Sequence, residues 1–115
     1  MTLKQAILTL PKLDKRWESR KNENGWWMVN TRNGDEWYCD EYITMDQLIA
    51  AARTIGYEIW WVLHLYNGKV VGYVSKWFLS ENCQGGGLVY KSPALAIRAA
   101  FIAAVQDAKK RKEKP

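Results

Sequence analysis

Apolar residues follow two kinds of pattern along this chain, and each pattern predicts a different element. Apolar positions three and four residues apart predict helices, as at Met45, Leu48, Ile49, Ala52 and Ile55. Aromatic-rich runs that end at turn residues predict strands. The order is α-β-β-α-β-β-β-α. The expected helices cover 2–10 (interrupted by Pro11), 45–55 and 93–110. A strand or an extended arm is expected around 17–22, and the expected strands cover 26–32, 36–42, 57–66, 69–78 and 88–91, with a glycine-rich loop at 80–87.

One pattern occurs twice: two tryptophans, five residues, then Asn-Gly. The copies run from Trp26 to Gly34 and from Trp60 to Gly68. Asn-Gly favours the type I′ turn of a tight hairpin, because both of its central residues need a positive φ. Each copy follows a helix start with Thr and, three residues later, Gln, which is the capping-box pattern. The chain therefore predicts duplicated helix–hairpin units.

The second hairpin predicts how its sheet must be covered. A two-residue turn at Asn67-Gly68 puts one apolar set on each face. The first set is Ile59, Trp61, Leu63, Leu65, Val70, Val74 and Phe78; the second is Trp60, Val62, His64, Val71, Tyr73 and Trp77. Since both faces are apolar, both need cover. We expect an α+β fold, an antiparallel sheet packed by helices in an ABA-like sandwich, completed by a second copy of the chain.

Composition narrows the class of protein. The 115 residues predict a single α+β domain over 1–110 with a basic tail at 111–115. The net charge is +5, and the run 109–114 supplies most of it, so the basic balance is weak support for nucleic-acid binding. No apolar run is long enough for a membrane span and no signal-peptide pattern is present, so we expect a cytoplasmic protein. Cys39 and Cys83 are expected as free thiols, with a single disulfide as the alternative.

Candidate chemistry favours binding over catalysis. No catalytic triad or metal-ligand spacing occurs, so no enzyme activity, metal or cofactor is expected. His64 lies mid-strand and is expected to be structural. Arg98 falls within the apolar stripe of the last helix, where it either snorkels, meets a carboxylate or contacts an anionic ligand. Ser92-Pro93 marks the start of that helix, whose free N–H groups favour anions.

Aromatic and basic residues alternate in several segments, which suits a base stacked on a ring beside a neutralised phosphate. The candidate ligand-binding residues are Arg98, Lys91, Tyr90, Trp77, Phe78, Lys76, Asn82, Trp60 and Tyr73.

The part of the chain from residue 44 onward resembles the phage ABA sandwich domains. The similar segments are Thr44-Met-Asp-Gln-Leu-Ile-Ala-Ala-Ala, Trp60-Trp61-Val62 and Lys91-Ser-Pro-Ala-Leu-Ala-Ile-Arg-Ala-Ala-Phe. That family looks related to Thoeris anti-defence proteins, oligomers that sequester cyclic nucleotide immune signals without degrading them. The resemblance implies a pocket near Arg98, Tyr90, Lys91 and the 77–85 loop. Residues 44–111 also have the element order of a double-stranded RNA-binding domain, but without its lysine cluster.

The sequence thus predicts a phage or prophage anti-defence protein that binds a small phosphorylated ligand, such as a cyclic nucleotide, in the cytoplasm of the infected cell, and that forms a homo-oligomer. Two alternatives remain: a protein–protein inhibitor of a host or defence complex (anti-CRISPR-like) that uses exposed tryptophans, and a nucleic-acid-binding domain.

Overall fold

The computed structural model describes residues 1–38, 43–79 and 82–113, with the side chains of 38 and 82–87 outside the description. The fold is α+β, and the elements follow the predicted order, with the segment 17–22 forming a strand, so that three strands lie between the first two helices. The helices are α1 (Leu3–Leu13), α2 (Met45–Thr54) and α3 (Pro93–Glu113). The strands are β1 (Trp17–Asn22), β2 (Gly25–Asn30), β3 (Glu36–Tyr38), β4 (Glu58–Tyr66), β5 (Lys69–Leu79) and β6 (Asn82–Tyr90).

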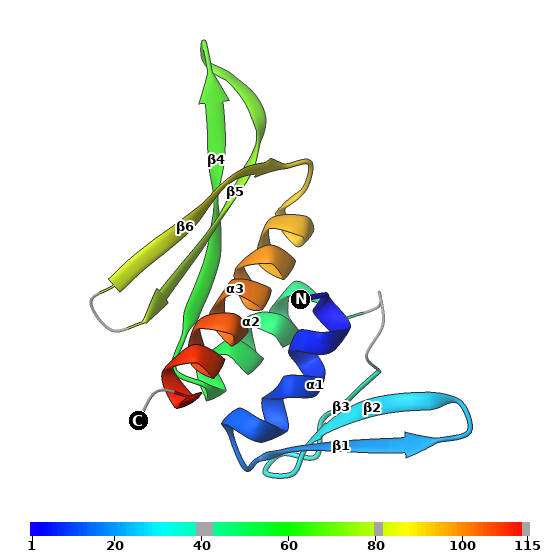
Figure 1. Ribbon diagram of the computed structural model, residues 1–115. Helices are drawn as coiled ribbons and strands as arrows, with labels where there is room; N and C mark the ends of the chain where they lie inside the picture. Colours follow the sequence, from blue (N-terminus) through cyan, green and yellow to red (C-terminus); the bar gives the residue numbers. More distant parts are fainter. Residues whose placement is uncertain (39–42, 80–81, 114–115) are drawn as a thin grey trace.

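The strands form two antiparallel sheets, ordered β1-β2-β3 and β4-β5-β6. The helices lie between them: α3 packs on the second sheet, and α1 contacts both α3 and β1 (Figure 1). The hairpin of β4 and β5 extends well past the start of α3, so its outer half leaves the body of the molecule. This projection makes the molecule elongated, with extents of 50 × 37 × 24 Å.

Within the described residues, one buried cluster joins the helices to both sheets. Ile7, Leu48 and Phe101 represent the three helices in it. From the first sheet, Trp17 packs on Trp37 with ring centroids 4.8 Å apart, and its Nε1–H donates to Thr54 Oγ1 at 2.8 Å. The second sheet contributes its lower end, through buried residues such as Ile59 in β4. Since this core ends where α3 begins, it supports only the lower half of the β4–β5 hairpin.

Both predicted capping boxes are present. Gln5 N–H donates to Thr2 Oγ1 at 3.1 Å, and Thr2 N–H donates to the Gln5 side chain at 2.7 Å. The same pair of bonds joins Thr44 and Gln47 at 3.2 and 2.9 Å. Each box satisfies backbone donors that the first helical turn leaves without a partner.

Two helices run past their expected ends. α1 continues through Pro11 to Leu13, because a proline in the last turn removes only a single hydrogen bond there. α3 reaches Glu113, so residues 111–113 of the expected basic tail are helical. Basic residues in a last turn favour the negative end of the helix dipole. In addition, Arg111 pairs with Asp107 at 2.7 Å and Lys112 bonds the Lys12 carbonyl.

The two Asn-Gly turns differ. Asn67 and Gly68 have φ of 51° and 76°, as a type I′ turn requires. At the first copy only Gly34 has a positive φ, so the predicted tight turn there was wrong. Instead, Asn30 N–H pairs with the Asp35 carbonyl and a wider loop forms. Asx bonds hold this loop, in which the side chains of Asn30 and Asn33 accept N–H groups two residues on.

The glycine-rich segment was predicted as a loop, and from residue 82 onward this was wrong. It forms β6, which pairs with β5 from Leu79↔Asn82 to Tyr73↔Tyr90. Glycines disfavour a strand, but a preformed neighbouring strand supplies the hydrogen bonds that override this weak preference. Residues 39–42, which complete the third predicted strand, and Ser80 and Glu81 lie outside the described residues.

Candidate interaction surface and ligand site

A β-bulge decides which side chains share a face in the second sheet. Next to the turn, Leu65 pairs with Val70, as the two-residue turn requires. The register then shifts between His64 and Leu65, so that Leu63 pairs with Tyr73. One extra residue in β5 turns every later β5 side chain to the other face.

The predicted faces were therefore wrong below the bulge. Tyr73 and Trp77 lie on the face of Ile59 and Trp61, which α3 covers at its lower end. Val74 and Phe78 lie on the opposite face, with Trp60. Ring contacts agree with this register: Trp61 meets Tyr73 edge to face at 5.2 Å, and Tyr57 meets Trp77 at 5.9 Å.

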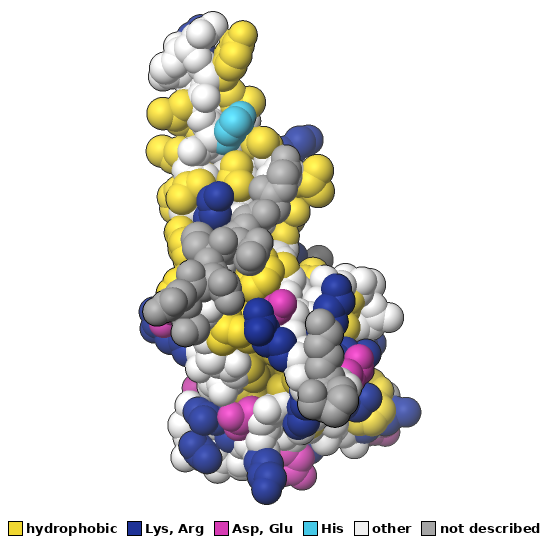
Figure 2. Space-filling model, turned by 60° about the vertical axis from the view of Figure 1, so that its left-hand side comes forward, with side chains coloured by type: hydrophobic (Ala, Val, Ile, Leu, Met, Phe, Trp, Pro, Cys, Tyr) yellow, Lys and Arg dark blue, Asp and Glu magenta, His cyan; other side chains and the backbone are white. Residues whose placement is uncertain are grey.

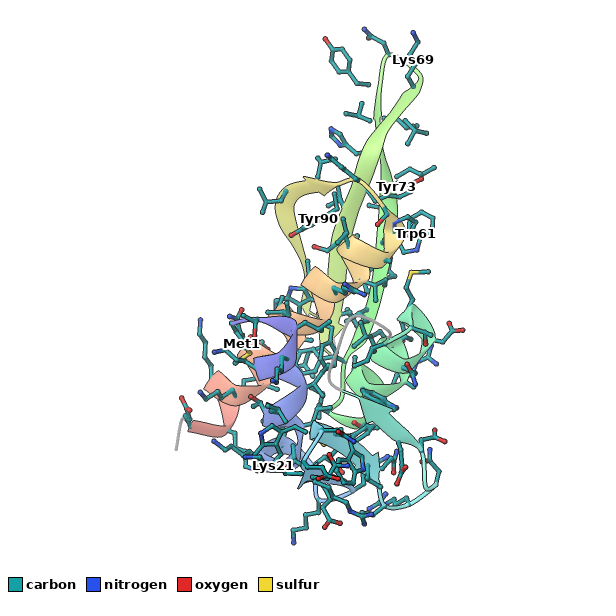
Figure 3. The ribbon with its side chains drawn as sticks, turned by 90° about the vertical axis from the view of Figure 1, so that its right-hand side faces the viewer. Met1, Lys21, Trp61, Lys69, Tyr73 and Tyr90 are labelled. Carbon is teal, nitrogen blue, oxygen red and sulfur yellow. The ribbon has the colours of Figure 1, made fainter. Side chains whose placement is uncertain are left out.

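Three aromatic residues lie in a row across the sheet on its helix-side face. Trp61 comes from β4, Tyr73 from β5 and Tyr90 from β6, where Tyr90 is the direct partner of Tyr73. We call these three residues the aromatic row. Figure 3 shows Trp61 and Tyr73 together near the start of α3, with Tyr90 on β6 at the same height and Lys69 far away at the tip of the hairpin. Gly72 makes the close approach of β6 possible, because a Cβ there would lie 2.7 Å from the Tyr90 carbonyl oxygen and 2.3 Å from Val89 Cγ1.

The first turn of α3 follows the aromatic row directly. Ser92 is the predicted N-cap, and its Oγ accepts the Leu95 N–H at 3.2 Å. Lys91 is exposed immediately before it. An aromatic row, an exposed ammonium group and the positive end of a helix dipole are thus neighbours, a combination that suits a planar group joined to an anion.

The structure divides the predicted site residues into separate groups. Tyr73, Tyr90 and Lys91 lie together at the aromatic row, and Trp77 lies deeper on the same face, against the core. Half-buried Arg98 lies further along α3. The opposite face carries Trp60, Lys76 and Phe78, and Asn82 is at the far end of β6.

Trp61 was missing from the predicted site. In the sequence, the repeated Trp-Trp pair was the feature that could have pointed to Trp61. Its position beside Tyr73 follows only from the register shift at the bulge.

Large exposed hydrophobic side chains concentrate on the projecting hairpin and its surroundings. We define the apolar hairpin surface as Trp61, Val62, Leu63, Leu65, Tyr66, Val70, Val71, Leu88 and Val89, with Met45 and Leu95 at the adjacent helix starts. Figure 2 shows apolar side chains along this projection, whereas charged side chains gather on the body. Among the described residues, Met1 and Trp26 are the large hydrophobics exposed elsewhere.

A polar cluster of Tyr57, Asp107 and Arg111 lies near the C-terminal end of α3. The buried Tyr57 hydroxyl donates to Asp107, which also accepts from Arg111 Nε at 2.7 Å. Burial raises the pKa of Tyr57 well above its usual range, and its bond to Asp107 adds to this. Burial alone would raise the pKa of Asp107, but the bonds from Tyr57 and Arg111 outweigh it and lower that pKa. At neutral pH the tyrosine is protonated and the carboxylate ionised, which suits a structural tie.

A small cavity of about 200 Å³ lies beside this cluster, lined by Leu13, Ile55, Tyr57, Leu79, Ala108, Arg111 and Lys112. It is at the opposite end of α3 from the aromatic row, so it adds nothing to that site.

Two kinds of feature are absent from the described parts of the chain. These parts contain no group of three His, Cys, Asp or Glu side chains placed to hold a metal ion, and no helix there has the length and hydropathy to cross a membrane. The predicted state of Cys39 and Cys83 concerns side chains outside the description. Comparison of the chain with protein-family models, curated proteins and solved structures gives no match.

Proposed function

We propose that this chain is a non-enzymatic binding protein that holds a small phosphorylated ligand, a cyclic nucleotide, against the aromatic row. The observation that carries the proposal is the position of Trp61, Tyr73 and Tyr90 beside the first turn of α3. A base would stack on the rings, while Lys91 and the Ala94 N–H at the helix start would receive the phosphate, because Pro93 has no N–H and the Leu95 N–H donates to Ser92 Oγ. Arg98, further along α3, would supply a second positive charge.

The sequence resemblance to phage ABA sandwich domains supports the biological setting. We propose that the protein acts in the cytoplasm of an infected cell, where it would lower the free concentration of a nucleotide immune signal. Sequestration needs affinity alone, and the polar cluster at Tyr57 and Asp107 has the protonation states of a structural tie rather than of an acid–base pair.

The test is thermal denaturation of the purified full chain with a panel of cyclic nucleotides. A ligand at a hundred times its dissociation constant stabilises the folded state by about 2.7 kcal/mol, which raises the melting temperature by several degrees. A bound nucleotide should be recovered unchanged after heating; recovery of a hydrolysed product would contradict the non-enzymatic mechanism.

Matched variants locate the site. Tyr90→Leu removes one ring of the aromatic row, and since stacking contributes about 1–3 kcal/mol per base, affinity should fall roughly 5- to 150-fold. Trp26→Leu removes an exposed ring from the other sheet, where it lies 5.4 Å from Lys21 Nζ, and should leave affinity unchanged. Lys91→Ala and Arg98→Ala should weaken binding of charged nucleotides and spare uncharged nucleosides. Equal affinities for the Tyr90 and Trp26 variants would refute the site.

A further inference from the structure

The outer half of the β4–β5 hairpin has apolar side chains on both faces and no core beneath it. From Trp61 to Val71 every side chain of the hairpin is exposed, and the buried cluster ends at Ile59. Leu63 and Leu65 point to the helix-side face beyond α3, while Val62 and Tyr66 point to the other face. Water-exposed apolar surface of this size, rimmed by polar residues, is typical of an interaction site.

β4 is an edge strand of the second sheet, so its outer backbone groups can pair with a strand of another chain. Edge strands of natural proteins normally carry charged residues or proline, which prevent pairing with another chain. β4 has neither from Ile59 to Tyr66: between these two residues the run contains five Trp, Val or Leu residues and His64. The bulge lies between His64 and Leu65, and from Glu58 to His64 the pairing of β4 with β5 has an unbroken register, so this stretch of the β4 edge is regular.

We propose that β4 pairs antiparallel with β4 of a second copy of this chain, so that two three-stranded sheets become one six-stranded sheet. The pairing is two-fold symmetric, because an antiparallel strand pair between identical segments is self-complementary. Each hairpin tip then lies beside the body of its partner, where Leu63 and Leu65 of one chain meet the exposed Met45 and Leu95 of the other.

The exposed apolar area is of the size that dimer interfaces use. Summed over both faces of the hairpin and β6, the exposed fractions of the apolar hairpin surface amount to roughly 900 Å², against ~800 Å² per partner in a standard interface. Edge pairing of β4 covers the part of this area next to β4 and adds the main-chain hydrogen bonds of the strand pair. The run Ile59–Tyr66 offers no carboxylate, lysine or arginine to attract a highly charged partner such as nucleic acid. A second copy of the chain would cover this apolar surface, and it is available wherever the protein is made. The inference does not depend on the ligand site.

Light scattering after size exclusion and sedimentation velocity test the proposal with the full chain at micromolar concentration. The expected mass is twice the 13.4 kDa of one chain. Leu65→Lys places two charges in the interface without touching the core, and should weaken self-association at least tenfold. Trp26→Lys makes the same change at an exposed aromatic on the other sheet and should leave the dimer intact. A cooperative melting transition in each variant confirms that both fold, and loss of the dimer lowers the melting temperature of the Leu65→Lys variant by mass action. A monomer at 100-fold higher concentration, or a dimer insensitive to Leu65→Lys, would overturn the proposal.

A cysteine scan separates edge pairing from packing of faces. Single cysteines at positions 60–65, with Cys39→Ser and Cys83→Ser, are oxidised and the covalent dimer is measured. Two-fold edge pairing brings a residue close to its own copy at one point only, so cross-linking should peak at one position or two adjacent ones and fall away on both sides. Cross-linking at alternate positions, 61, 63 and 65 or 60, 62 and 64, would mean that faces pack and would refute the edge pairing. A foreign protein as the true partner would leave the pure chain monomeric, which also refutes it.

Discussion

The hydroxyl of Tyr57 is the best single atom with which to test the energetics of this fold. Tyr57 is 2% exposed and its hydroxyl donates to Asp107 across 50 positions of sequence. Replacing it with phenylalanine removes this bond and nothing of the ring that packs on Trp77. A hydrogen bond to a charged group contributes about 1.5–3 kcal/mol, and Asp107 keeps its bond from Arg111, so the expected loss at neutral pH is about 1–2 kcal/mol.

The loss should depend on pH in a defined direction. The pKa of Asp107 is lower in the folded chain than its ordinary value of 3.8. A carboxyl group with a lowered folded pKa stabilises the protein above its unfolded pKa, and this stabilisation is lost as the pH falls through the folded pKa. The difference between wild type and Tyr57→Phe should therefore be constant from pH 5 to 7 and shrink below about pH 4, where a neutral carboxyl leaves only a weaker bond.

Urea denaturation followed by tryptophan fluorescence at pH 7 and pH 3 measures both quantities. Tyr66→Phe is the matched control, because Tyr66 is 70% exposed at the hairpin tip and should change stability by less than about 0.5 kcal/mol. Equal effects of the two variants, or a Tyr57→Phe effect that grows in acid, would refute the reasoning.

Three further predictions concern packing and capping. Gly72→Ala should destabilise the fold by about 1–3 kcal/mol in urea denaturation, since the new Cβ meets the backbone of β6; Val89→Ala should restore part of the loss, and Val71→Ala alone should cost little. Thr44→Ala should cost about 1 kcal/mol by removing an N-cap, and equal stability of this variant and wild type would contradict the capping role. Trp17→Phe should cost about 1–3 kcal/mol in the same assay, because it leaves a hole beside Trp37 and removes the bond to Thr54.

Local signals in the sequence were sufficient for much of the fold. The helix starts at Thr2 and Thr44 need only residues within one turn, and both capping boxes form as predicted. The turn at Asn67-Gly68 is likewise fixed by the two residues that adopt a positive φ. Where a short segment carries all the chemistry that a feature needs, the pattern alone was enough.

Features that depend on neighbours in space were missed. The bulge after His64 has no local signature, yet it moved Tyr73 to the face of Trp61 and so changed the composition of the candidate site. The same Asn-Gly pair gave a wider loop at Asn33, because the side chains of Asn30 and Asn33 bond to the backbone there. β6 depends on a strand next to it rather than on its own glycine-rich residues.

The unsupported outer hairpin also has a consequence for the motions of the chain. Beyond Leu63 and its partner Tyr73, its backbone is paired only in the β4–β5 ladder, and the buried cluster does not reach it. Local opening of this end of the hairpin breaks few buried contacts, so the free energy of this opening lies far below that of global unfolding. Native-state hydrogen exchange should accordingly find two tiers within a single strand: slow amides near Ile59 and fast ones near Leu65, with the fast tier slowing once the β4 edge is occupied.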